Sequence, residues 1–394
     1  MPAAPAFASA ETAGELVELY WQALLRDVPF ADYGSDMQVA AACADLNALS
    51  DFRGPIESGP GAVTPNSIFR GPTPGDLAGP YVSQFLLQDV PYGASTIVQQ
   101  YKVPAAGVHY MQGVPEWLAI QNGDPPAGPV AYEASPAYVF NGAVLNEYVH
   151  RDALFQPYLN AALILQRNGY AHDPADPYAA AARSAGFVTF GEVHLLDLVA
   201  HVAALALTAA WYQKWLVHRR ARPEAVAGAV HMHLSSLASY PLHADVLGSS
   251  VLPPIETLNG GTWLLPQAYP EGSPAHPAYP AGHATVAGAG ITILKAFFDE
   301  SAVIPGPVQP SADGSSLQAW AGAPLTVGGE LNKLGFNVAM GRNWAGIHWR
   351  SDAVESMKLG EQVALSLLRD VRGCYNEPFN GFTLTKLDGT TVTV

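Results

Sequence analysis

Three short segments, far apart in the chain, concentrate side chains suited to binding a tetrahedral or trigonal-bipyramidal oxyanion. They cover residues 214–223, 280–283 and 342–352. Together they supply cations, a glycine amide, histidines and a carboxylate; the members are Lys214, Arg222, Gly282, His283, Arg342, His348 and Asp352. The whole chain carries a formal charge of −15 at pH 7. An anion would therefore need a local cluster of cations to hold it.

The first segment places two cations near the end of a predicted helix. Alanine and leucine dominate residues 192–219, which favours helix, and Lys214 and Arg222 lie near its end and just beyond it. Cations there suit the negative end of the helix dipole. A solvated basic helix terminus explains the same residues, because Arg219 and Arg220 lie between them.

The second segment ends a proline-rich loop and begins a helix. Residues 283–299 have a helical pattern, so Gly282 and His283 lie at its start. A helix start offers free backbone N–H groups to an anion, and glycine lets the anion approach without a side chain in the way. His283 could exchange a proton near neutral pH. The alternative is a turn glycine beside a histidine that caps the helix.

The third segment spaces Arg342, His348 and Asp352 by six and then four residues. A carboxylate four positions after a histidine can lie on the same helical face. It would accept a hydrogen bond from one ring nitrogen and leave the other free for a metal or phosphorus centre. The alternative is a partly buried His–Asp pair that only caps the helix.

The elements that must position these segments are predicted to be helices. Helical patterns cover residues 11–25, 35–49, 153–169, 192–219, 224–236, 283–299 and 351–371. Proline-rich connections lie at 52–80, 113–137, 251–282 and 303–326, and a short strand signal occurs at 382–394. We predict an all-α fold of one or two helical bundles with long proline-rich loops. It would form a single domain over residues 1–394, with the active-site half at about 190–372.

Composition narrows the class of protein. With 394 residues, 49% of them hydrophobic, the chain can form a large globular core. Its acidic balance argues against nucleic acid and against an anionic membrane surface. The longest apolar stretch, residues 198–211, is too short to span a bilayer. Residues 1–15 have no signal-peptide pattern, so we expect a cytoplasmic protein. Cys43 and Cys374 are expected to be buried free thiols.

The order of the three segments resembles the vanadium-dependent haloperoxidase and type-2 phosphatidic-acid phosphatase superfamily. That pattern is a Lys/Arg-Pro segment, then Pro-Ser-Gly-His, then Arg-x5-His-x3-Asp. The bromoperoxidase branch of marine algae and cyanobacteria is more similar still, with the same seven-residue gap between Lys214 and Arg222 and a histidine, His276, seven positions before His283. Similar stretches include ELYWQALLRDVPFADY, GPYVSQF and WYQKWLVHRRARPEA, and the resemblance covers roughly residues 15–370.

The resemblance implies a helical-bundle fold of the vanadium haloperoxidase type, with vanadate and no haem as cofactor. His348 would bond to vanadium and Asp352 would orient its ring. The equatorial oxygens would be held by Lys214, Arg222, Arg342 and the Gly282 amide. His283 would take a proton from hydrogen peroxide, and Lys214 would polarise the peroxide toward attack by halide. The product would be a hypohalous acid equivalent that halogenates a small organic acceptor, with bromide or iodide as the expected halide.

One position departs from the family pattern, and two more are candidates for the halide route. Ala281 replaces the family serine before Gly-His, so a hydroxyl donor to one vanadate oxygen is absent. His276 and Trp211 would line the halide pocket; a satisfied loop histidine and a core tryptophan are the alternatives.

Two other functions fit the same residues. An acid phosphatase would use His348 as a nucleophile that forms a phosphohistidine, with His283 as the acid for the leaving group. A non-catalytic helical binding protein with a relict pocket is the other, and Ala281 favours it. Relatives of the bromoperoxidase branch assemble as dimers or larger rings. We therefore expect a homo-oligomer, with exposed helical faces near the N-terminus as its interface.

Overall fold

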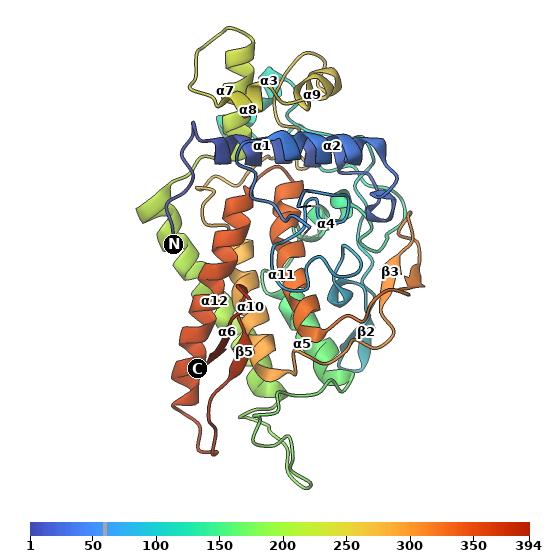
Figure 1. Ribbon diagram of the computed structural model, residues 1–394, viewed down its shortest axis with the longest axis vertical. Coiled ribbons are helices and arrows are strands. Elements are labelled where there is room, and N and C mark those ends of the chain that lie inside the picture. The colour runs from blue at the N-terminus through green and yellow to red at the C-terminus, as the bar shows by residue number, and fades with distance from the viewer. Residues whose placement is uncertain (58–60) are drawn as a thin grey trace.

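The centre of the molecule is a bundle of four long helices. A computed structural model describes residues 1–57 and 61–394. Helix α10 (Gly282–Phe297) packs most extensively against α12 (Arg350–Arg372), α6 (Glu192–Tyr212) and α11 (Val327–Trp344). Figure 1 shows α10, α11 and α12 side by side, with α1 crossing near one of their ends. The mostly helical fold is as predicted, whereas the single-domain boundaries stay a prediction.

Glycines allow α10 and α12 to approach closely. A Cβ atom built on Gly360 would lie 1.9 Å from the carbonyl oxygen of Thr285, and one on Gly288 would lie 2.0 Å from that of Met357. No side chain fits at either position, so the two backbones are almost in contact. This close crossing fixes the N-terminus of α10 relative to the N-terminus of α12, where two of the predicted segments end.

Helix α11 is absent from the sequence-based prediction. Its sequence, VGGELNKLGFNVAMGRNW, is rich in glycine and polar residues, which disfavour helix in isolation. Almost every residue of α11 is buried, so it has no apolar stripe of helical period. Instead, buried polar side chains of α11 form hydrogen bonds with the surrounding structure. Lys333, for example, donates to Glu330 Oε1 and to the Ala78 carbonyl.

The N-terminal helices lie across the bundle. Helix α1 (Ala10–Leu25) contacts α2 (Met37–Ala48) and α11. Nearly all of α1 is buried, and Asp36 caps α2 through the amides of Gln38 and Val39. The expectation of an oligomer interface on exposed helical faces near the N-terminus is therefore wrong for α1, whose faces are already covered.

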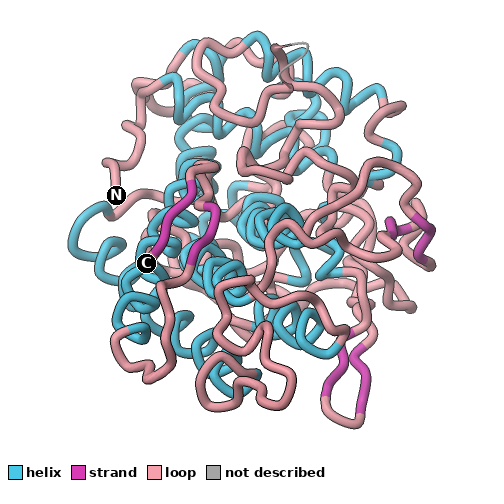
Figure 2. Tube along the Cα trace, turned by 60° about the horizontal axis from the view of Figure 1, so that its bottom comes forward, coloured by secondary structure: helices cyan, strands magenta, loops and turns pink. Residues whose placement is uncertain are grey.

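The remaining elements are short. Within the described residues the strands form three antiparallel hairpins (Figure 2): β1 (Val90–Tyr92) with β2 (Ser95–Ile97), β3 (Val308–Pro310) with β4 (Leu317–Ala319), and β5 (Thr383–Thr385) with β6 (Thr391–Thr393). The last hairpin accounts for the strand signal at the C-terminus. The other helices are η1 (Phe30–Asp32), η2 (Gln84–Leu86), α3 (Val114–Gln121), α4 (Gly142–Tyr148), α5 (Gln156–Arg167), α7 (Pro223–Leu234), α8 (Ala244–Leu247) and α9 (Leu252–Leu258). Two of them, α3 and α9, lie inside segments predicted as proline-rich connections.

The long helix predicted over residues 192–219 changes geometry before its end. After α6 the chain continues as a π-helical turn, η3 (Gln213–His218), and Arg219 ends it with a φ of +48°. Residues 192–234 are long and apolar enough for a helix that crosses a membrane. A single candidate of this kind is weak evidence for a membrane protein.

The two cysteines differ in burial. Cys43 is buried as expected, but Cys374 is exposed, so the prediction of buried thiols is wrong for Cys374.

Candidate active site

The three predicted segments meet at one end of the four-helix bundle. They are brought together by η3 after α6, by the N-terminus of α10, by the C-terminus of α11 and by the N-terminus of α12. Lys214 Nζ donates at 2.6 Å to the carbonyl of Pro277, in the loop that leads into the second segment, and Arg222 Nη1 donates to the Ile347 carbonyl of the third segment at 2.8 Å. Lys214 and Arg222 are buried, so the interpretation of a solvated basic helix terminus is wrong for both.

Lys214 is a buried amine among other cations. Its side chain follows the π-helical turn and also donates to the Ala278 carbonyl at 3.2 Å. Burial, together with repulsion from Arg222 and Arg342, lowers the pKa of Lys214 to about 7. The amine therefore holds its proton less tightly than an exposed lysine does, and a bound anion would raise its pKa again.

Arg222 and Asp352 hold the ring of His348 from its two sides. Asp352 Oδ2 lies 2.8 Å from Nδ1 of His348, and Arg222 Nη1 lies 3.0 Å from Nε2. All three side chains are buried. Burial lowers the pKa of His348 well below its usual value, and the cations Arg222, Lys214 and Arg342 lower it further. The ring therefore carries one proton, which the carboxylate places on Nδ1, and Nε2 keeps a lone pair that faces the cations.

Helix geometry explains this His–Asp contact differently from the sequence prediction. Residues 348 and 352 do not share a helical face, because α12 begins only at Arg350. Asp352 is the third residue of the helix, and its Oδ2 also accepts the Trp349 backbone N–H at 3.1 Å. The carboxylate caps the helix start and orients the histidine at the same time.

Arg220 supports this carboxylate and was missed by the sequence analysis. Its Nη1 donates to Asp352 Oδ1 at 2.9 Å, and its Nη2 donates to Glu15 Oε2 at 2.6 Å. Its guanidinium also lies 4.6 Å from the ring centroid of Trp349. Burial raises the pKa of Asp352, and the charge of Arg220 opposes that rise. No sequence signal separates Arg220 from its exposed neighbour Arg219.

Arg342 and Gly282 complete the set of donors. Arg342 Nη1 donates to the Val149 carbonyl at 2.8 Å, and its buried Nε has no hydrogen-bond partner among residues 1–57 and 61–394. Gly282 is the first residue of α10, where backbone amides have no acceptor within the helix. A Cβ on Gly282 would lie 3.2 Å from Leu207 Cδ1, so the approach to this amide is narrow. The preceding residue, Ala281, leaves α10 without a side-chain cap.

His283 forms a second histidine–carboxylate pair. Its Nε2 lies 3.1 Å from Oδ1 of Asp152, a residue distant in sequence that the sequence analysis did not identify. Burial and the charge of Arg342 lower the pKa of His283, although Asp152 opposes them. The ring is therefore a neutral base near pH 7: its Nε2–H donates to the Asp152 carboxylate, and Nδ1 keeps a lone pair.

Comparisons with known proteins agree with this geometry. A family model described as "VCPO second helical-bundle domain" matches residues 194–377. The vanadium-dependent bromoperoxidase of Corallina pilulifera is 36% identical over 456 residues, spanning 100% of this chain and 76% of that protein. The one from Ascophyllum nodosum is 38% identical over 385 residues, spanning 93% of this chain and 69% of that protein.

A solved structure has the same fold. It is the homohexameric second vanadate-dependent bromoperoxidase of Ascophyllum nodosum, with a TM-score of 0.93, 32% identity, and coverage of 98% of this chain and 71% of that one. The chain belongs to the vanadium-dependent bromoperoxidase family. The predicted resemblance is confirmed, and the family name implies a vanadate cofactor.

The site of this bromoperoxidase-family protein fits an oxyanion such as vanadate. The described residues hold no cluster of three or more His, Cys, Asp or Glu side chains able to chelate a metal ion. They offer one unprotonated imidazole nitrogen on His348 and surrounding cationic donors instead. The unpartnered Nε of Arg342 is a buried donor that still needs an acceptor. An anion bonded to His348 would supply that acceptor and offset the repulsion between Lys214, Arg222 and Arg342.

The two halide-pocket candidates lie at the edge of this cluster. His276 Nδ1 is 3.1 Å from Arg222 Nη2, and the His276 ring packs edge-on against Trp211 with centroids 5.1 Å apart. Burial and the charges of Lys214 and Arg222 lower the pKa of His276 to about 4, so its ring is neutral. Trp211 is 47% exposed, which excludes a core tryptophan. The two rings form a partly apolar approach to the cations.

Proposed function

We propose that this protein is a vanadate-dependent haloperoxidase. It oxidises bromide or iodide with hydrogen peroxide to a hypohalous acid equivalent, which halogenates an organic acceptor. In overall balance, hydrogen peroxide, bromide and one proton give hypobromous acid and water. The observation that carries this proposal is the placement of the His348 ring, with Nδ1 2.8 Å from Asp352 Oδ2 and Nε2 turned toward the buried cation Arg222 at 3.0 Å. The assembly is proposed to be homo-oligomeric.

The roles of the residues follow from their contacts. His348 would bond to vanadium through Nε2, while Asp352 keeps the proton on Nδ1. Lys214, Arg222, Arg342 and the Gly282 amide would hold the oxygens; each charge-assisted hydrogen bond contributes about 1.5–3 kcal/mol. When bound, vanadate supplies a Lewis-acid centre that activates hydrogen peroxide without changing its own oxidation state.

Proton transfer is assigned to His283 and charge stabilisation to Lys214. Neutral His283 accepts a proton from hydrogen peroxide, and Asp152 stabilises the imidazolium that forms. Lys214, whose pKa is lowered by burial to about 7, gains charge where negative charge accumulates. His276 and Trp211 border the route by which halide arrives.

The test is peroxide-dependent bromination of a phenolic reporter by protein loaded with orthovanadate. We expect turnover in the wild type, its loss in His348→Ala, and its retention in His201→Ala, which changes an exposed histidine on α6. Absence of bromination by vanadate-loaded wild type would refute the proposal. Robust hydrolysis of phosphomonoesters without bromination would instead favour the phosphatase, which needs the same lone pair on His348 as its nucleophile.

A further inference from the structure

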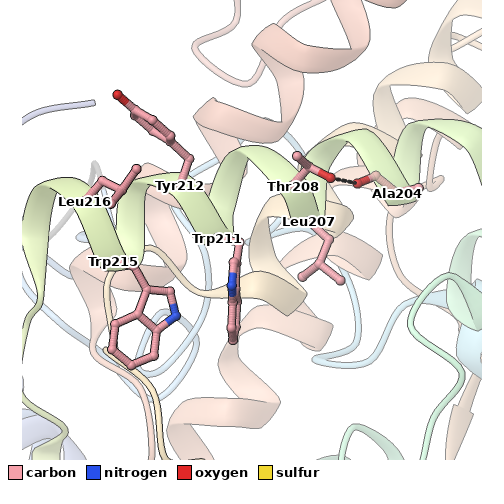
Figure 3. A pocket seen from close by; sticks show the side chains of 7 residues that line it. All are labelled: Ala204, Leu207, Thr208, Trp211, Tyr212, Trp215 and Leu216. Carbon is pink, nitrogen blue, oxygen red and sulfur yellow. Dashed lines mark hydrogen bonds between the residues drawn. The ribbon is translucent and has the colours of Figure 1, made fainter.

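One face of α6 and η3 is exposed, apolar and without charge. We call it the α6 seam; it consists of Ala204, Leu207, Thr208, Trp211, Tyr212, Trp215 and Leu216 (Figure 3). Among its large apolar side chains the exposed fractions reach 66% for Leu216, 58% for Tyr212 and 47% for Trp211. Contiguous apolar surface of this kind is unusual on a monomer and marks an interaction site.

The α6 seam has the spacing of a helix-packing surface. Ala204, Thr208, Trp211 and Trp215 follow one another at intervals of four, three and four residues, which is the spacing of the core positions of a coiled coil. Thr208 donates its hydroxyl to the Ala204 carbonyl at 3.0 Å, so the polar group of this residue is already satisfied within the helix. Aromatic side chains of this kind dominate the energetics of protein interfaces.

Charge distribution favours a second copy of the same chain as the occupant. Two copies each carry a formal charge of −15 and repel one another across most of their surfaces. Between residues 200 and 217, however, the exposed positions include no Asp, Glu, Lys or Arg. The α6 seam is therefore a surface on which two copies can meet without burying like charges.

Other occupants fit the surface less well. A small molecule needs a concave site, whereas all seven residues belong to one helical stretch, and the hollow beside them, of about 950 Å³, is open. A membrane span needs lipid on all sides, whereas α6 packs its other face against α10 and α12. The negative surface of a membrane would also repel an acidic chain.

We propose that a second copy of this chain packs its own α6 seam against this one in a self-complementary contact. This inference rests on the proposed homo-oligomer and assigns its interface. The contact borders the active site, because Trp211 packs on His276 and Leu207 lies beside Gly282. The second copy covers the outer side of Trp211 and so forms part of the wall along the approach to the cations.

Light scattering coupled to size exclusion tests the assignment independently of halide oxidation. We expect wild type at a multiple of 41.6 kDa. Ala204→Glu and Leu216→Glu should each raise the dissociation constant at least tenfold, because each carboxylate would be buried against apolar groups. Leu237→Glu is the matched control, since Leu237 is 70% exposed but lies outside the seam, and it should keep the wild-type mass. Wild type at 41.6 kDa, or wild-type mass in both seam variants, would overturn the proposal.

A photo-crosslinking residue at position 216 tests the contact without introducing charge. Irradiation should give a covalent dimer on a denaturing gel, and the same residue at position 237 should not. A dimer formed only from position 237 would overturn the proposal. So would a monomer that floats with phosphatidylcholine vesicles, because it would assign the α6 seam to lipid.

Discussion

Arg220 is predicted to hold the orienting carboxylate of the active site, and replacing it tests this contact network most sharply. Its guanidinium bridges Asp352 and Glu15, and it also donates to the hydroxyl of Ser351 at 2.6 Å. The side chain of Arg220 is 7% exposed, and those of Glu15 and Asp352 are 6% and 0% exposed. Arg220→Met would therefore leave two buried carboxylates without their cation.

The burial of these three side chains sets the loss of unfolding free energy that we expect from Arg220→Met. Removing one partner of a buried ion pair destabilises a protein by about 3–5 kcal/mol, because the remaining charge is left without compensation. Arg220→Lys keeps the charge, but an ammonium group cannot reach Ser351, Asp352 and Glu15 together as the planar guanidinium does. Its loss of unfolding free energy should therefore be smaller than that of Arg220→Met but greater than zero. Because Asp352 orients the proposed ligand His348, we also expect vanadate affinity to fall by about 10–100-fold in Arg220→Met.

The assay is urea unfolding together with equilibrium dialysis against orthovanadate. Arg167→Met is the matched control, since Arg167 is 51% exposed and pairs with Glu192 at 2.8 Å; an exposed pair contributes about 1 kcal/mol at most. A loss of unfolding free energy in Arg220→Met no larger than in the control would refute the reasoning. Unchanged vanadate affinity in a folded Arg220→Met protein would show that Asp352 orients His348 without help from Arg220.

Three further substitutions test individual groups of the site. Burial and neighbouring cations lower the pKa of Lys214, so part of the amine is neutral at pH 8 before vanadate binds. Calorimetry of vanadate binding in two buffers should therefore show more proton uptake by the wild type than by Lys214→Arg, and equal uptake would contradict this. Asp152→Asn removes the charge that raises the pKa of His283, so the acidic limb of the bromination rate should move to lower pH and the maximal rate should fall by about 10–100-fold; an unchanged profile would exclude His283 as the base. Ala281→Ser places a hydroxyl at the uncapped start of α10, so we expect about 0.5–2 kcal/mol of added stability. The same hydroxyl should bind vanadate about tenfold more tightly through one charge-assisted hydrogen bond, and unchanged affinity would show that the missing family hydroxyl has no role.

Much of the fold could be predicted because most of its helices have local signals. The patterns at 11–25, 283–299 and 351–371 correspond to α1, α10 and α12 within two residues at each end. Helix α11 could not be predicted, because its polar residues are satisfied by partners distant in sequence rather than by solvent. For the same reason the π-helical turn that aims Lys214 into the site has no local signature.

The residues of the candidate site likewise fall into those that the sequence could identify and those that it could not. Its principal residues could be identified because their types and order resemble a family pattern, and the structure brings all of them together. Arg220 and Asp152 could not be identified, because their roles depend on contacts with Asp352 and His283 that lie 132 and 131 positions away. Nothing in the local sequence distinguishes such residues from solvated charges.

The central claim is that one imidazole nitrogen, supported by buried cations, holds vanadium in this chain. Vanadium content after exhaustive dialysis tests it directly, measured by elemental analysis on wild type, His348→Ala and the exposed-histidine control His201→Ala. We predict about one vanadium per chain in wild type and control, and almost none in His348→Ala. Vanadium retained equally by His348→Ala would contradict the account, as would a wild type that retains none.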